Sequence, residues 1–205
     1  MRGLTQRLED ARSYRGAWLR PSNFESFWET SVTFAQNANV ESVVELPSAT
    51  QAATFKRITF TSTDQMQLRA RVILPAGVSV AEPLAPAGLP ASAELPAVVL
   101  FSDFGRGVRS WLHLLRFSAL GMPVVALEAR PCEASLKDAW RGALTAEELA
   151  HALINPDDAA SSTLKQLIDD ALVTTAVASR FLGRTTVTWG EGLGGSQALF
   201  TAALL

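Results

Sequence analysis

The sequence predicts an α/β fold in which helices flank a mostly parallel sheet. Residues 97–101 (AVVLF) and 123–127 (PVVAL) are short, continuously apolar runs, typical of strands buried on both faces of a parallel sheet. A helical pattern over residues 108–121 separates the two runs, and this alternation indicates right-handed crossover connections. A third strand, residues 185–189, leads into a glycine cluster and a helix of small residues. Because parallel strands place sites at their carboxyl ends, we expect any chemistry in the loops that follow these strands.

The N-terminal segment, residues 1–40, predicts a helical extension. Either Ser22 or Asn23 is a suitable N-cap for a helix over residues 23–38. The aromatic side chains of that helix recur at spacings near 3.6 residues: Phe24, Phe27, Trp28 and Phe34. We expect this face to pack against the main core, with an interface to a partner chain, to which Trp18 would also contribute, as the alternative.

A hairpin and a long loop follow. Residues 54–60 and 66–74 alternate polar and apolar side chains around a turn-like stretch, which predicts an antiparallel hairpin at an edge of the sheet. Residues 75–96 are rich in proline and alanine and predict a mobile loop. After the parallel strands, the pattern predicts a long helix that begins near Asn155 and is closed by Gly183.

Composition excludes several classes of protein. The chain has 205 residues, 48% hydrophobic and 19% charged, and a net charge of −2, which suits one globular domain without a nucleic-acid footprint. A single cysteine, Cys132, rules out an internal disulfide framework and a cysteine zinc cluster. The charged segment 1–21 lacks the apolar core of a signal peptide, and no apolar run is long enough to span a bilayer, so we expect a cytoplasmic protein.

The glycine cluster can be fitted to the nucleophile pattern G-x-S-x-G of serine hydrolases in two ways. The first frame is 190–194, which places Gly192 where the serine belongs and keeps the distance from the strand. The second frame is 194–198, which makes Ser196 the nucleophile but needs a longer loop and puts alanine where the tight turn favours glycine. Turn sterics favour the first frame, in which Ser196 is a residue of the first helical turn.

The order of these features resembles the acetylxylan esterase and cephalosporin C deacetylase family of α/β-hydrolases. FESFWE (24–29) resembles the family's F-D-E-F-W segment, and the stretch 98–131 resembles its V-V-x-x-H-G-Y … R-G-Q segment. IDDALVTTAVASRF (168–181) resembles its L-D-A-x-R-A helix, and the last block resembles its G-G-S-Q-G-G elbow. The resemblance implies an α/β-hydrolase fold, ring-like homo-oligomers, and hydrolysis of acetyl esters of small saccharides by a Ser-Asp-His triad. We expect no cofactor, and no metal, because two distant histidines without H-x-x-H or H-x-D spacing leave too few ligands.

Each role in that triad is in doubt here. The two histidines, His113 and His151, both precede the elbow, whereas the family's catalytic histidine follows it, and we expect both to be ordinary helix or loop residues. Glu191 is expected to be a solvated loop carboxylate, and Cys132 an ordinary thiol. The resemblance assigns oxyanion or substrate contacts to Phe104 and to the backbone of Leu193. Arg130 keeps the arginine of R-G-Q, and we expect it to anchor its loop to a carboxylate.

We therefore expect a single but incomplete α/β-hydrolase domain over residues 1–205, ending after the elbow helix, in which the edge strand 185–189 and the final helix lack neighbours. The favoured function is a catalytically defective relative of carbohydrate acetyl esterases, a pseudoenzyme. Two alternatives stay open. One is an active esterase that uses Ser196 and is completed by residues outside this chain, and the other is a non-catalytic binding or scaffold subunit.

Overall fold

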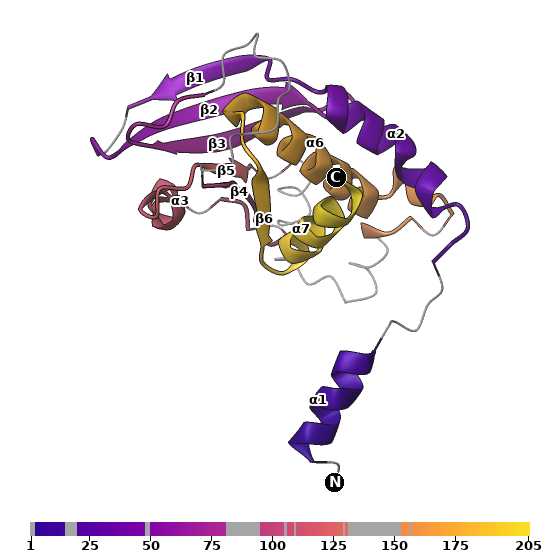
Figure 1. Ribbon diagram of the computed structural model, residues 1–205. Helices are drawn as coiled ribbons and strands as arrows, with labels where there is room; N and C mark the ends of the chain where they lie inside the picture. The colour runs from indigo at the N-terminus through magenta and orange to yellow at the C-terminus, as the bar shows by residue number, and fades with distance from the viewer. Residues whose placement is uncertain are drawn as a thin grey trace, which may run out of the picture.

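A computed structural model of the chain describes residues 3–14, 20–47, 50–80, 95–104, 106–108, 110–128, 130, 153–155 and 157–205. The described residues contain a six-stranded sheet in the order β1-β2-β3-β5-β4-β6 (Figure 1). The strands are β1 (Ser42–Leu46), β2 (Ala53–Thr61), β3 (Gln67–Pro75), β4 (Ala97–Phe101), β5 (Val124–Leu127) and β6 (Thr186–Gly190).

The sheet is mixed. β5, β4 and β6 are parallel, and β4 and β5 are buried along their whole length, as their continuous apolar runs predict. β1, β2 and β3 are antiparallel, and β3 joins the parallel half by an antiparallel pairing with β5. The α/β class is thus confirmed, while the parallel part makes up only half of the sheet.

The predicted hairpin is confirmed as β2 and β3, which pair from Thr61 with Gln67 to Ala53 with Pro75. Its expected place at an edge is wrong, because β1 pairs with β2 and forms the edge. β1 carries four exposed residues in succession, so it lacks the alternation that reveals a half-buried strand. Residues 81–94, most of the predicted 75–96 loop, lie outside the described residues.

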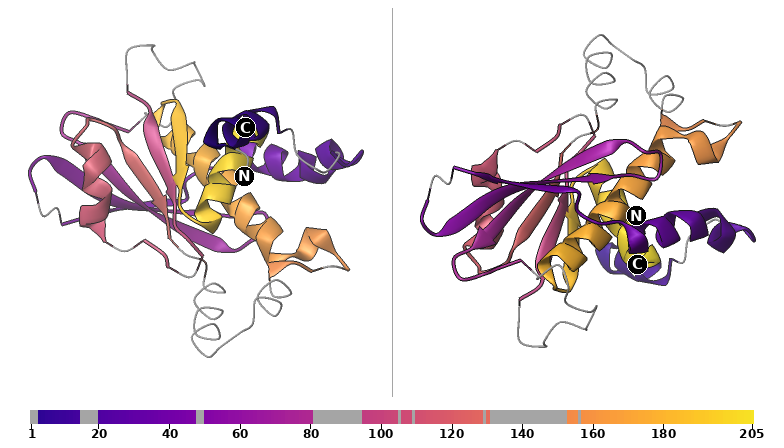
Figure 2. Two further views of the ribbon diagram at one scale, coloured as in Figure 1. Left: turned by 90° about the horizontal axis from the view of Figure 1, so that it is seen from below. Right: turned by 90° about the horizontal axis from the view of Figure 1, so that it is seen from above.

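Helices cover both faces of the sheet (Figure 2). The described helices are α1 (Leu4–Ser13), α2 (Phe24–Asn37), α3 (Trp111–Ser118), the short 3₁₀ helix η1 (Ala159–Ser161), α6 (Thr163–Leu182) and α7 (Leu193–Leu204). α2, α6 and α7 share one apolar core with the sheet, whereas α3 packs with Phe55, Leu100 and Val124 on the other face. None of the helices in the described ranges has the length and apolar character needed to cross a membrane.

The aromatic face of α2 packs inward. Trp28 is buried and its ring lies 5.8 Å from that of Phe200 on α7, while Phe24, Phe27 and Phe34 pack against the same core. The packing prediction is confirmed, while Phe24, Phe27 and Phe34 stay partly exposed and the alternative interface stays a prediction. Trp18 lies outside the described residues.

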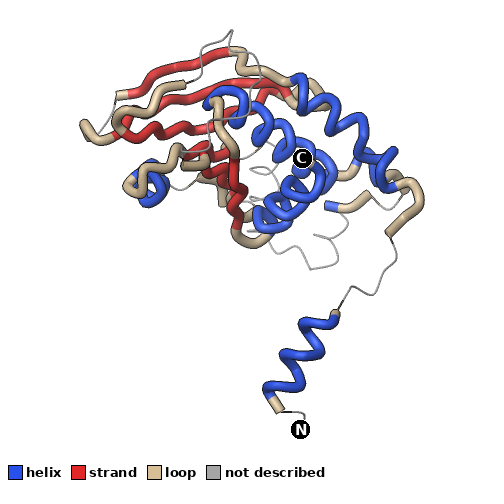
Figure 3. Tube along the Cα trace, viewed as in Figure 1, coloured by secondary structure: helices blue, strands red, loops and turns tan. Residues whose placement is uncertain are grey.

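Two boundaries differ from the prediction. α6 begins at Thr163 instead of near Asn155, because Asp158 caps η1 through Ala160 N–H and Ser162 then caps α6 through Lys165 N–H. α7 was expected to lack a layer to pack on, yet it lies against α6 and β6, as Figure 3 shows. Gly183 closes α6 in the left-handed conformation, as predicted.

Candidate active site

A sharp turn joins β6 to α7 and forms the centre of the candidate site. Gly192 lies in this turn with φ 58° and ψ −126°, directly before the first residue of α7, Leu193. Backbone N–H groups of Gly194 and Gly195 bond back to the carbonyls of Glu191 and Gly192, which closes the turn. A side chain at position 192 is strained in this conformation, and glycine carries no such penalty. We call residues 190–195 the elbow.

The glycines on either side of position 192 allow close backbone contacts. A Cβ atom on Gly190 would lie 1.9 Å from the Gly194 carbonyl oxygen, and one on Gly194 would lie 2.4 Å from the Phe101 carbonyl oxygen. α7 therefore starts in direct backbone contact with the ends of β6 and β4. The spacing of three glycines in the 190–194 frame follows from this geometry.

Ser196, the alternative nucleophile, lies in the first turn of α7 and is half-buried. Its backbone is part of the regular helix, whereas the strained conformation is that of Gly192. The neighbouring Gln197 is buried and donates to the Leu167 carbonyl 2.7 Å away, which ties this turn of α7 to α6.

Phe104 and Leu193, the two predicted oxyanion residues, are brought together. Their backbone N–H groups come from the loop after β4 and from the start of α7, and both donate to one oxygen, Asp103 Oδ1, at 2.9 Å and 3.1 Å. The Phe104 side chain is buried, which fixes the backbone at this point. The sequence prediction assigned no role to Asp103, because nothing in the chain indicates that its carboxylate meets a residue 90 positions away.

A small cavity of about 50 Å³ lies beside this carboxylate. Its polar lining includes Asp103, Arg106, His113 and Glu191, and Trp189 contributes an apolar wall. His113 is an exposed residue of α3, as predicted, but the fold also places it at the cavity. An imidazole is thus present near the elbow, although no serine stands at position 192.

Two residues of the loop after β5, Glu128 and Arg130, form ion pairs away from the elbow. Glu128 pairs with Arg71 at 3.0 Å, and Arg130 is buried between carboxylates. The Arg130 guanidinium bonds to Asp170 on α6 through Nε and Nη2, and to Asp64 in the β2–β3 turn through Nη1 and Nη2. The expectation that Arg130 anchors its loop to a carboxylate is confirmed.

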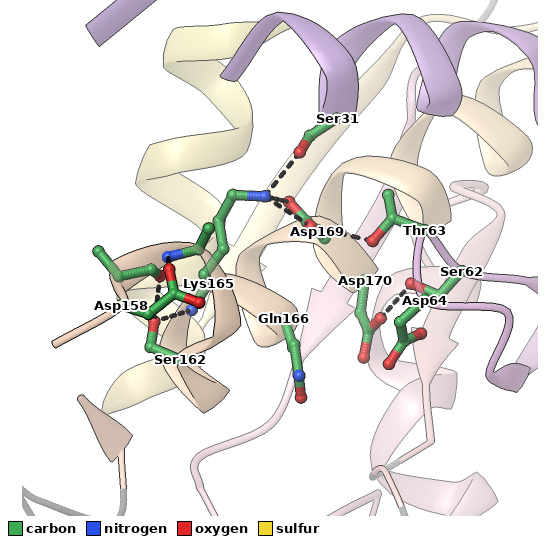
Figure 4. Close-up of polar contacts among 12 residues, drawn as sticks. Ser31, Ser62, Thr63, Asp64, Asp158, Ser162, Lys165, Gln166, Asp169 and Asp170 are labelled. Carbon is green, nitrogen blue, oxygen red and sulfur yellow. Dashed lines mark hydrogen bonds and ion pairs between the residues drawn. The ribbon is translucent and has the colours of Figure 1, made fainter. Parts of the chain in front are cut away.

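The polar contacts continue through the β2–β3 turn and α6 (Figure 4). Ser62 donates to Asp170, and Thr63 donates to Asp169 at 2.9 Å. Lys165 reaches Asp169 at 2.7 Å and also donates to Ser31 of α2. Every carboxylate in this region is thus satisfied by a hydrogen-bond donor, and the region is structural in character.

Charge and burial shift the titration of this region. The hydrogen bond from Arg130 lowers the pKa of Asp64 below its usual range. Burial alone lowers the pKa of Arg130, but the bonds to Asp170 and Asp64 outweigh burial, so that pKa is raised. Burial raises the pKa of Asp170 against the opposing pull of Arg130.

Two sequence candidates, Cys132 and His151, lie outside the described residues. Across the described ranges there is no group of three or more histidine, cysteine or acidic side chains placed to hold a metal ion. The arrangement that remains is a strand–turn–helix elbow with glycine at its centre and two converging N–H groups.

Comparison with known proteins identifies the family. The family described as Acetyl xylan esterase (AXE1) matches residues 1–205, and no curated protein sequence matches. Acetyl xylan esterase 1 from a Thermoanaerobacterium species is 19% identical with a TM-score of 0.70, covering 96% of this chain and 59% of its own. Acetyl xylan esterase from a Paenibacillus species is 19% identical with a TM-score of 0.69, covering 100% and 61%.

These solved structures establish the α/β-hydrolase-type fold, and this chain spans about 60% of their length. The family match over all 205 residues establishes the family as well as the fold. The chain belongs to the acetyl xylan esterase family.

Proposed function

We propose that this chain is a catalytically defective acetyl xylan esterase scaffold, in which Gly192 occupies the position of the nucleophilic serine. The observation that carries the proposal is the backbone of Gly192, with φ 58° and ψ −126°, between the end of β6 and the start of α7. A nucleophile elbow places its serine on a strained strand-to-helix turn of this kind. The glycines at 190 and 194, which the backbone contacts require, support the same frame.

The chemistry explains why this change is severe. Ester hydrolysis by a triad needs a hydroxyl to attack the carbonyl and an imidazole to take its proton. Position 192 offers only hydrogen, and removal of one triad member costs several orders of magnitude in rate. His113 lines the adjacent cavity, but an imidazole without a nucleophile cannot form an acyl-enzyme.

The ester class follows from the family. The matching structures are called acetyl xylan esterases, so an acetylated saccharide is the substrate class that we propose for a complete member of this lineage. A cytoplasmic location and assembly into homo-oligomers remain predictions from the sequence and the resemblance.

The test is an esterase assay with p-nitrophenyl acetate and acetylated xylose at neutral pH. We expect no turnover above the buffer rate and no covalent labelling by a fluorophosphonate probe. Ser196→Ala is the matched control, because under this proposal it leaves both readouts unchanged. Turnover or labelling that disappears in Ser196→Ala would contradict the proposal and favour Ser196 as the nucleophile.

A further inference from the structure

The side chain of Asp103 fills the space above the elbow. Asp103 lies two residues after β4, and its Oδ1 atom accepts the N–H groups of both Phe104 and Leu193. The two donors come from the loop after β4 and from the first residue of α7, which lies 90 residues after Asp103, and they meet at a single oxygen. This is the arrangement in which a hydrolase holds the negatively charged oxygen of its intermediate.

The carboxylate is well stabilised in this place. Leu193 is the first residue of α7, so its N–H has no partner within the helix. The positive end of the helix dipole favours an anion there, and hydrogen bonds to a charged acceptor are stronger than neutral ones. Arg106 lies 3.5 Å from the second oxygen of Asp103, but Arg106 is mostly exposed and adds little.

Gly192 makes room for this carboxylate. A Cβ atom at position 192 would lie 2.0 Å from Asp103 Oδ1 and 2.4 Å from its Cγ. No side chain at 192, serine included, fits while Asp103 keeps both N–H bonds. The residue at the nucleophile position and the carboxylate on the neighbouring loop are therefore mutually dependent.

We infer that Asp103 is a built-in occupant of the oxyanion hole, defined here as the N–H groups of Phe104 and Leu193. This inference rests on the proposed function, because it takes Gly192 as the nucleophile position. It deepens that proposal: the hole is filled by the chain's own carboxylate and is closed to an ester carbonyl. A serine at position 192 and the carboxylate of Asp103 in the oxyanion hole exclude each other, because a Cβ at 192 would lie 2.0 Å from Asp103 Oδ1.

The test follows the amide protons of Phe104 and Leu193 by NMR. In Asp103→Ala, we expect both resonances to move upfield and both amides to exchange faster with solvent, because they lose a charged acceptor. Asp158→Ala is the matched control, since Asp158 accepts the Ala160 N–H at 3.0 Å in an exposed turn. That variant should shift the amide proton resonance of Ala160 and leave the resonances of Phe104 and Leu193 unchanged.

A second variant tests the steric half of the inference. Gly192→Ala should expel the carboxylate and move the Phe104 amide in the same direction as Asp103→Ala does. Its control is Gly77→Ala, which carries the same left-handed strain at φ 81° but has open space around the added Cβ. Gly77→Ala should leave Phe104 unchanged.

Unchanged Phe104 and Leu193 amides in Asp103→Ala would overturn the inference. If Asp103→Ala does not fold, Asp103→Leu keeps a similar branched shape and offers no acceptor oxygen, and unchanged amides in that variant would have the same meaning. These readouts do not depend on turnover. Ester hydrolysis by the unaltered chain would contradict the proposed function. Unchanged amide proton resonances in Asp103→Ala would contradict only the inference about Asp103.

Discussion

The elbow and the buried ion pairs of Arg130 both hold loops against the sheet, and they do so by opposite means. The Arg130 network, defined as Arg130, Asp170, Asp64, Ser62 and Gln166, uses charged and polar side chains that satisfy one another. The elbow uses glycines, whose missing side chains let α7 touch the ends of β6 and β4. The Arg130 network therefore depends on polar side chains, whereas the elbow depends on positions that have no side chain.

The difference separates stability from catalysis. A buried ion network loses stability when any one member is lost, because the partner is left charged and unpaired. The backbone shape of the elbow depends on close contacts of its glycines, and these contacts need no hydroxyl group. Under the proposed function, the fold is therefore retained although the nucleophile is lost.

Loss of Arg130 should have the largest effect on stability. Arg130→Ala leaves Asp170, whose side chain is 1% exposed, without its cationic partner, and we expect a loss of about 3–5 kcal/mol in the free energy of unfolding. Urea unfolding followed by circular dichroism measures it. Arg20→Ala is the control, because its ion pair with Glu25 is exposed and is worth about 0–1 kcal/mol. Equal losses in the two variants would show that burial does not give the network its importance.

A methyl group at the elbow is the next largest perturbation. The Cβ of Gly194→Ala would lie 2.4 Å from the Phe101 carbonyl oxygen, a backbone atom that cannot turn aside, so we expect a loss of about 1–3 kcal/mol. Gly195→Ala is the matched control, since its Cβ has only a 3.4 Å contact, and in a helix alanine is favoured by up to about 1 kcal/mol. In thermal unfolding, Tm should fall in Gly194→Ala and rise in Gly195→Ala relative to the unaltered chain. Similar losses in both variants would contradict the role of the close contact at Gly194.

Much of this contrast could be anticipated from local sequence patterns. β4 matches the predicted residues 97–101 because a strand buried on both faces needs an unbroken apolar run. The glycine spacing at 190–194 predicts a tight strand-to-helix turn, since such a turn excludes Cβ atoms, whereas the role of Gly192 as the nucleophile position stays a prediction. β1 was missed because its side chains are exposed and show no period.

The side-chain partners could not be predicted. A carboxylate partner for Arg130 was expected from the chemistry of arginine, but Asp64 and Asp170 lie 66 and 40 residues away, and only the fold selects them. The contact of Asp103 with Leu193 has the same character. Its neighbour Phe104 is singled out by the family resemblance, whereas the only sequence signal at Asp103 is that it stands at the glycine of the family's H-G-Y pattern.

The smallest expected effect is a change in how folding stability falls at low pH. Arg130 holds the pKa of Asp64 below its usual range, so the stability that Asp64 contributes is present at neutral pH and is lost as the pH falls below about 4. Burial raises the pKa of Asp170, which acts in the opposite sense and reduces the net acid sensitivity. Asp64→Asn should therefore lose less stability than the unaltered chain between about pH 4 and pH 2, by about 1 kcal/mol or less because Asp64 is partly exposed.

Urea unfolding at several pH values gives the free energy of unfolding as a function of pH for Asp64→Asn and for the unaltered chain. The slopes of these two curves are then compared. Asp157→Asn is the control, since Asp157 is an exposed residue outside the Arg130 network, and its slope should equal that of the unaltered chain. A steeper acid loss in Asp64→Asn than in the unaltered chain would contradict the sign assigned to Asp64.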